Sequence, residues 1–303
     1  MKKAILILFI SSLLIAACGS ASPVSQDGKK TIVVTYSILG ALVKDLVGNQ
    51  AVVTVLIPNG QNLHEWEPSA RDIEALMKAD LLVQNGLELE NGLQKTFSQA
   101  STAGVKMFIA TDHITVRRVK AGEGIPSADP DQVAGAADPH IWTDPLTMKA
   151  VMLALAEQLK TDLGIDLSAR AADLASRLDG LNNDITSLVA TLPEANRRLV
   201  TGHESLGYFA ERYGFHLLGA IIPSLNSQAE VSAAGLATLK ALIQGSQIKA
   251  IFTEVGTPKS ISDSLGSETG VKVVQLPTHI LPDDGSYFTF MHQLAGTIVE
   301  NLH

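Results

Sequence analysis

Short runs of apolar, mostly β-branched residues alternate with segments of helical spacing along most of the chain. Eight such runs have the length and composition of strands: 32–35, 52–57, 81–84, 105–109, 199–201, 217–222, 250–253 and 271–276. Amphipathic segments at 205–213, 232–244 and 260–269 separate the later runs. Because strands that alternate with helices form parallel sheets covered by helices, the pattern predicts an α/β protein with two lobes, each with a parallel sheet flanked by helices.

A longer amphipathic segment lies between the two sets of strands. Over residues 166–191 apolar side chains recur every three or four positions, and no proline interrupts them before Pro193. The spacing predicts a helix of about 25 residues, roughly 38 Å long. We expect this segment, 166–192, to join an N-terminal lobe (31–165) to a C-terminal lobe (193–303) as a rigid backbone helix that restricts hinge opening. On pattern alone, it could also be an ordinary long helix inside one domain.

The N-terminus has the layout of an export signal. Lys2 and Lys3 precede an apolar run at 4–17, and small residues precede Cys18 in the string LLIAACGS. The string resembles the bacterial lipobox, so we expect a signal peptide over 1–17 and a lipid anchor on Cys18, with a plain signal peptide as the alternative. Residues 18–30 are polar and Ser-rich, as in a flexible tether. Cys18 is the only cysteine, so no disulfide is expected.

Composition supports a globular chain and excludes several partners. The 303 residues are enough for about two domains, and 46% of them are hydrophobic. The formal net charge of -8 comes from 23 basic and 31 acidic residues, and the clustered Lys and Arg of a nucleic-acid surface are missing. We therefore expect no nucleic-acid partner. The pair Arg117–Arg118 is expected to be solvated.

Four of the eight histidines follow candidate strands or lie in loops rich in Pro and Asp. They are His64, His140, His203 and His279. Ligands of open α/β sheets bind beyond the carboxyl ends of strands, and imidazole is the commonest protein ligand for zinc. A divalent-metal site built from several of these side chains is therefore the leading hypothesis. The other four, at 113, 216, 292 and 303, have ordinary surface or structural interpretations.

Four blocks of the sequence resemble one family. NLHEWEPSARDIEAL, DPHIWTDPLTMKAV, TGHESLGYFAERYG and FTEVGTPKSISDSLGSETG, in this order, are similar to blocks of the cluster A-I substrate-binding lipoproteins of ABC transporters for zinc and manganese. The resemblance implies two α/β lobes joined by one rigid helix, with one metal ion between them. It places the first three ligands on His64, His140 and His203.

The fourth ligand position departs from the family pattern. The family usually has an Asp where this chain has His279 after Thr278. We favour His279 as the fourth ligand, with Asp283 or Asp284 as alternatives. Glu254 is expected to orient one of the imidazoles, since a metal-bound His usually needs such a partner.

Three or four imidazoles favour Zn²⁺, whereas Mn²⁺, the alternative, prefers more oxygen ligands. Segment 117–138, where zinc members often carry a His-rich loop, contains no His. We expect an exported monomer, lipid-anchored on the outer face of the cell membrane, that passes metal to an ABC permease with a cytoplasmic ATPase. It is not expected to be an enzyme, and it has no Walker motif. A surface adhesin and a metallohydrolase are the less favoured alternatives.

Overall fold

The computed structural model describes residues 28–124 and 133–303. The predicted signal peptide, Cys18 and most of the tether lie outside these residues. The strands are β1 (Thr31–Tyr36), β2 (Val52–Ile57), β3 (Leu81–Gln84), β4 (Lys106–Ile109), β5 (Arg198–Thr201), β6 (His216–Ala220), β7 (Ala250–Thr253) and β8 (Lys272–Gln275). The helices are α1 (Ser37–Val47), α2 (Ala70–Met77), α3 (Gln94–Thr102), α4 (Pro145–Leu163), α5 (Ser168–Val189), α6 (Gly207–Tyr213), α7 (Ala233–Gly245), α8 (Lys259–Thr269) and α9 (Tyr287–Leu302).

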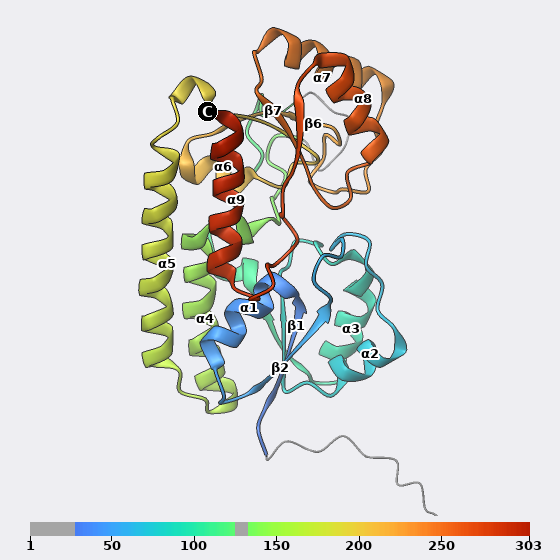
Figure 1. Ribbon diagram of the computed structural model, residues 1–303. Helices are drawn as coiled ribbons and strands as arrows, with labels where there is room; N and C mark the ends of the chain where they lie inside the picture. The colour runs from blue at the N-terminus through green and yellow to red at the C-terminus, as the bar shows by residue number, and fades with distance from the viewer. Residues whose placement is uncertain (1–27, 125–132) are drawn as a thin grey trace, which may run out of the picture.

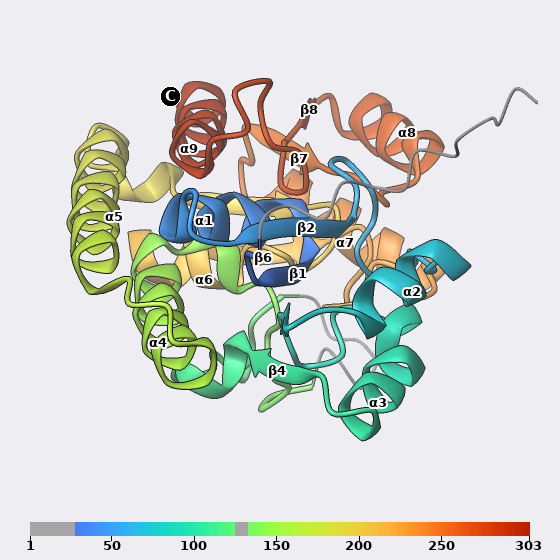
Figure 2. The same ribbon diagram turned by 90° about the horizontal axis from the view of Figure 1, so that it is seen from below.

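The first lobe is built on a parallel sheet with the order β2-β1-β3-β4. Seen from below, α1, α4 and α5 lie on one side of its strands, and α2 and α3 lie on the other (Figure 2). Strand β1 is buried along nearly its whole length because helices cover both faces of the sheet. The predicted α/β class with parallel sheets is confirmed.

The second lobe departs from the single parallel sheet that the sequence pattern suggested. Its strands form two parallel pairs, β5 with β6 and β7 with β8, and β5 lies beside β7. The pairing of β5 with β6 is also irregular, with a shift of register between Leu199 and Val200. Helices α7 and α8 cover this lobe at its outer end (Figure 1), over a small apolar core of its own.

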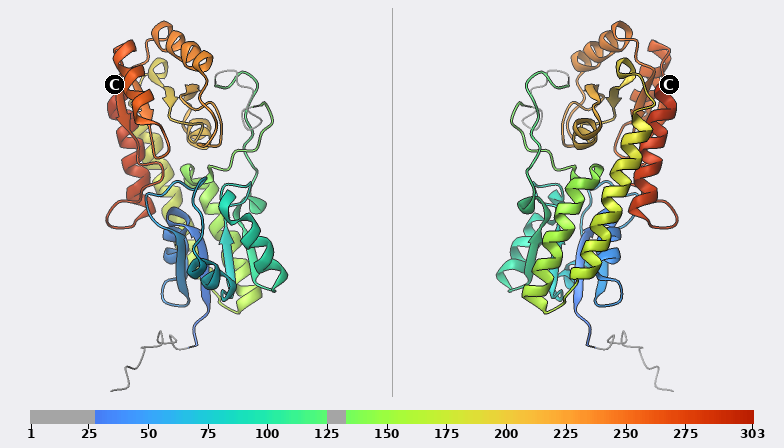
Figure 3. Two further views of the ribbon diagram at one scale, coloured as in Figure 1. Left: turned by 90° about the vertical axis from the view of Figure 1, so that its right-hand side faces the viewer. Right: turned by 90° about the vertical axis from the view of Figure 1, so that its left-hand side faces the viewer.

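Helix α5 occupies most of the segment where the sequence predicts one long helix. It runs along one side of the molecule with α4 and α9 beside it (Figures 1 and 3). Its inward face is fully apolar: Ala171, Leu174, Leu178, Leu181, Ile185 and Val189. Arg170 donates to the carbonyls of Asp45 and Leu46 at the end of α1, and Arg177 lies over the ring of Phe288 of α9. These contacts fix α5 along its length.

Within the described residues, none of the helices combines the length and the apolar character needed to cross a membrane.

Packing of α5 can be tested by truncating one buried side chain. Leu178→Ala should lower the free energy of unfolding by about 2–5 kcal/mol, because Leu178 is fully buried and its loss leaves a cavity. Urea unfolding followed by circular dichroism measures the change. The matched control is Asn183→Ala on the exposed face of α5, which should change stability by less than about 0.5 kcal/mol. Equal effects of the two substitutions would contradict the orientation of α5.

Candidate metal centre

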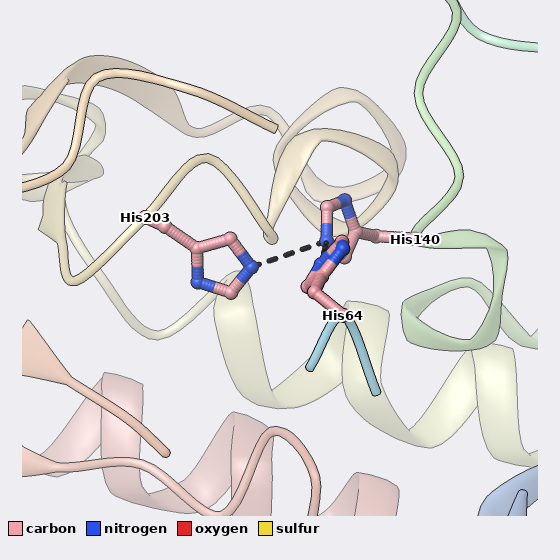
Figure 4. A group of neighbouring side chains, drawn as sticks. All are labelled: His64, His140 and His203. Carbon is pink, nitrogen blue, oxygen red and sulfur yellow. Dashed lines mark hydrogen bonds between the residues drawn. The ribbon is translucent and has the colours of Figure 1, made fainter. Parts of the chain in front are cut away.

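Four imidazoles from four separate loops meet between the lobes. His64 follows β2, His140 precedes a short 3₁₀ turn at Ile141–Thr143, His203 follows β5 and His279 follows β8. Each is at most 3% exposed. Nε2 of His140 lies 3.4 Å from Nε2 of His64 and 3.2 Å from Nε2 of His203 (Figure 4). The ring of His279 stacks against that of His203, with 5.8 Å between centroids. The structure thus brings possible ligand atoms of His64, His140 and His203 within 4.8 Å of one another and places His279 beside this group, against the ring of His203.

His140 is held by the loop that precedes it. Both its backbone N–H and its Nδ1 lie 2.9 Å from Oδ1 of Asp138, which is fully buried. The side chain of Asn85, at the end of β3, donates to the carbonyl of Pro139 at 2.9 Å. Thr143 closes the turn by donating to the carbonyl of His140. Sequence reasoning missed Asp138 and Asn85, although an Asp two residues before the His was a signal for the first.

His203 is held by Glu254, the residue directly after β7. Oε1 of Glu254 accepts the backbone N–H of His203 at 3.0 Å and lies 2.7 Å from its Nδ1, although the angle at Nδ1 falls short of a good hydrogen bond. Its other oxygen accepts from Ser205 at 2.7 Å and from Thr278 at 2.6 Å. Glu254 therefore lies against an imidazole, as expected from the sequence.

The same carboxylate indirectly orients His279. Because the hydroxyl of Thr278 donates its hydrogen to Glu254, it can only accept from Nδ1 of His279, which lies 2.9 Å away. The proton of neutral His279 is therefore assigned to Nδ1. Nε2 of His279 is buried and has no hydrogen-bond partner among the described residues.

These partners occupy the Nδ1 atoms and leave the Nε2 atoms available as electron-pair donors to a metal ion. His140 and His203 each face a carboxylate with Nδ1, so the hydrogen of each neutral ring is assigned to Nδ1 and the lone pair to Nε2. The two Nε2 atoms lie 3.2 Å apart, and with these assignments each turns a lone pair toward the other. Such an arrangement is repulsive without a positive charge between the nitrogens, and one atom each from His64, His140 and His203 lies within 4.8 Å of the others. The geometry is suited to a divalent cation.

Burial lowers the pKa of three of the imidazoles. Loss of hydration lowers the pKa of His64 and His140 and lowers that of His279 to about 3. Burial alone would raise the pKa of Glu254, but the adjoining His203 outweighs it and the pKa lies well below its usual range. The same balance, with the hydrogen bond from His140 opposing burial, lowers the pKa of Asp138. His64, His140 and His279 therefore face the site uncharged at neutral pH, and the ionised carboxylates of Asp138 and Glu254 lie behind the rings of His140 and His203.

An apolar wall and a narrow opening border the cluster. Trp142 is fully buried, its ring lies 5.3 Å from that of His140 and 5.5 Å from that of His279, and its Nε1–H donates to the carbonyl of Thr278. A small polar cavity of about 70 Å³ reaches His64, with Glu88 and Asn226 in its lining. Metal ligands in such a setting are shielded from bulk water except at this opening.

Asp283 and Asp284, the alternative fourth ligands, are not brought to the imidazoles. Both are exposed. Asp284 instead accepts the backbone N–H of Ser286 at 2.9 Å and the hydroxyl of Thr289 at 2.7 Å, at the start of α9. Its role there is to stabilise the helix N-terminus, for which Asp is a favoured residue. His113, which the sequence left outside the site, stacks on Phe108.

Comparisons with known proteins agree with this arrangement. The family model described as the periplasmic component A of the zinc-uptake complex matches residues 32–301. The manganese-binding lipoprotein MntA of Halalkalibacterium halodurans is 29% identical over 310 residues, 98% of this chain and 97% of the relative. The solved structure of the periplasmic zinc-binding protein TroA of Treponema pallidum aligns with a TM-score of 0.78 at 26% identity, covering 91% of this chain and 99% of that one. The predicted family resemblance and two-lobe fold are confirmed.

The depressed histidine pKa values predict that the metal-free protein loses stability in mild acid. Below pH 6.5 an unfolded chain protonates these imidazoles, whereas folded His279 resists protonation down to about pH 3. The free energy of unfolding should therefore fall by about 1.4 kcal/mol per pH unit for each such imidazole between pH 6.5 and pH 5. Urea unfolding in a chelator at several pH values measures this slope. His279→Gln should reduce it, and an unchanged slope would contradict the burial of a neutral ring.

Proposed function

Because the chain belongs to the family of the periplasmic component A of zinc-uptake complexes, we propose that it captures one Zn²⁺ between its lobes and delivers it to a membrane permease. The observation that carries the proposal is the meeting of buried imidazole nitrogens: Nε2 of His140 lies 3.4 Å from that of His64 and 3.2 Å from that of His203. A cation in their midst converts mutual repulsion into coordination. The proposed fourth ligand is His279, whose buried Nε2 would then gain a partner.

Zinc is favoured over manganese by the chemistry of the donors. Four neutral imidazoles suit a tetrahedral Zn²⁺ site, whereas Mn²⁺ prefers carboxylate oxygens. The buried carboxylates of Asp138 and Glu254 lie behind imidazoles and not among the Nε2 atoms. Manganese is the second candidate because the relative MntA is named as a manganese-binding lipoprotein.

A carrier fits this site better than a hydrolase. A catalytic zinc ion keeps a coordination position open for water or substrate, whereas four protein ligands would fill a tetrahedral site. The cargo would pass to an ABC permease powered by a separate cytoplasmic ATPase. We further propose that residues 1–17 are removed and that Cys18 anchors the monomeric protein to the outer face of the membrane through the tether at 18–30. In this proposal the lobes are 31–165 and 193–303, linked by the helix over 166–192.

Metal titration of the mature, metal-stripped chain tests the proposal. We expect one Zn²⁺ per chain, preferred over Mn²⁺ in competition against a chelating dye. His140→Ala and His203→Ala should each weaken zinc binding by more than about 100-fold, since even partners behind a ligand are worth 10–100-fold. His279→Ala should also weaken it.

Asp284→Ala is the matched control for His279→Ala, since both residues lie in the loop between β8 and α9. It should leave zinc affinity unchanged and only weaken the start of α9. A preference for Mn²⁺, or a loss of binding confined to Asp284→Ala, would exclude the all-histidine zinc site.

A further inference from the structure

Arg117 lies inside the protein, not in solvent as the sequence suggested for the pair Arg117–Arg118. Its side chain is 6% exposed, whereas Arg118 is exposed. Nη1 of Arg117 lies 3.1 Å from Oδ2 of Asp138, Nη2 contacts Glu123, and Nε lies 3.5 Å from Glu211. A guanidinium that gives up its hydration in this way needs such anionic partners.

The buried carboxylate of Asp138 is shared between this arginine and an imidazole. Oδ1 faces Nδ1 and the backbone N–H of His140, and Oδ2 accepts from Arg117. A fully buried carboxylate keeps a fixed plane only if both oxygens are bonded, because an unpaired buried charge is strongly destabilising. Arg117 therefore fixes the carboxylate that fixes the ring of His140.

Arg117 and Asp138 also rest on the first turn of α6, in the lobe that carries His203. The backbone N–H of Arg117 donates to the hydroxyl of Tyr208 at 2.9 Å, and Glu211 of the same helix faces the guanidinium. Gly207, the first residue of α6, permits the close approach, since a Cβ there would collide with both Asp138 and Arg117. The orientation of His140 is thereby tied to the position of an element in the other lobe.

From these contacts we infer that Arg117 is a positioning residue for metal binding: it acts through Asp138 to hold His140 in the orientation that the ion requires. The inference deepens the proposed function and rests on it. Removing a residue that hydrogen-bonds a metal ligand typically weakens metal binding 10–100-fold. Asp138 is such a residue for His140, and Arg117 supports Asp138. The positive charge of Arg117 also repels a cation. If positioning dominates, removing Arg117 should weaken zinc binding; if repulsion dominates, removing it should tighten zinc binding.

A second arginine–aspartate pair provides a matched control. Arg212 of α6 donates to both oxygens of Asp144 at 2.9 and 2.7 Å, and so also ties α6 to the segment after His140. Asp144 accepts from Leu146 and Thr147 at the start of α4, and among the described residues it makes no hydrogen bond to an imidazole. Arg212 lies in the last turn of α6, so breaking this pair should leave the contacts of Arg117 and Asp138 with the first turn in place.

The test compares Arg117→Met, Arg117→Lys and Arg212→Met in the mature chain. Readouts are zinc affinity by chelator competition, the visible absorption spectrum of bound Co²⁺, and melting temperature with and without zinc. Arg117→Met should weaken zinc binding by about 10-fold or more and alter the Co²⁺ spectrum. Arg117→Lys, which keeps the charge but not the planar fork, should lose affinity less. Arg212→Met should lower the melting temperature of the metal-free protein and leave zinc affinity and the Co²⁺ spectrum unchanged.

The inference fails if Arg117→Met keeps both wild-type affinity and spectrum, or if it binds zinc more tightly, which would make repulsion the dominant effect. If Arg117→Met does not fold, Arg117→Lys decides: an altered Co²⁺ spectrum supports positioning, and an unchanged one overturns it. If Arg212→Met loses as much zinc affinity as Arg117→Met, the loss is explained by general destabilisation of the fold, and the inference is overturned. Absence of zinc binding by the wild-type chain would instead contradict the proposed function itself.

Discussion

The structure depends on keeping several uncharged imidazoles close together in a place that water hardly reaches. Left to themselves, the Nε2 atoms of His140 and His203 would avoid a separation of 3.2 Å, because each presents a lone pair to the other. They are held there by carboxylates behind the rings and by loops anchored to strand ends. The fold thus preorganises the site for a cation, because folding supplies the free energy that holds the nitrogens close together.

The two carboxylates that contact the imidazoles, those of Asp138 and Glu254, come from different parts of the chain. Asp138 reaches His140 from the loop before α4, and Glu254 reaches His203 and Thr278 from the end of β7. The charge of Asp138 is paired with the guanidinium of Arg117, so the two carboxylates act mainly by orienting imidazoles that belong to both lobes. Binding of an ion between these imidazoles stabilises the folded, closed arrangement by mass action, because only that arrangement assembles the full set of groups.

The sequence predicted the positions of the imidazoles better than their environment. Strands β2, β3 and β7 coincide with the predicted runs, and the histidines at strand ends do converge. These features follow from local periodicity and from the rule that ligands gather at the carboxyl ends of parallel strands. The burial of Arg117 could not be predicted because it depends on Tyr208, about ninety residues away, and on the missing side chain of Gly207. The case of Asp284 is different, because its partners Ser286 and Thr289 are close in the sequence and hold it at the start of α9, away from the site.

Release of a bound ion is constrained by the contacts that join the loops around it. Asn59 forms a reciprocal pair of hydrogen bonds with the backbone of Leu281, and the N–H of Gly60 donates to the carbonyl of His279. The indole of Trp142 adds a further bond to Thr278. Helix α5 packs along α1, α4 and α9. Any opening that exposes the imidazoles therefore has to break these loop contacts. Displacing the loops that carry His64 and His279 would break these bonds and leave the cores of both lobes intact.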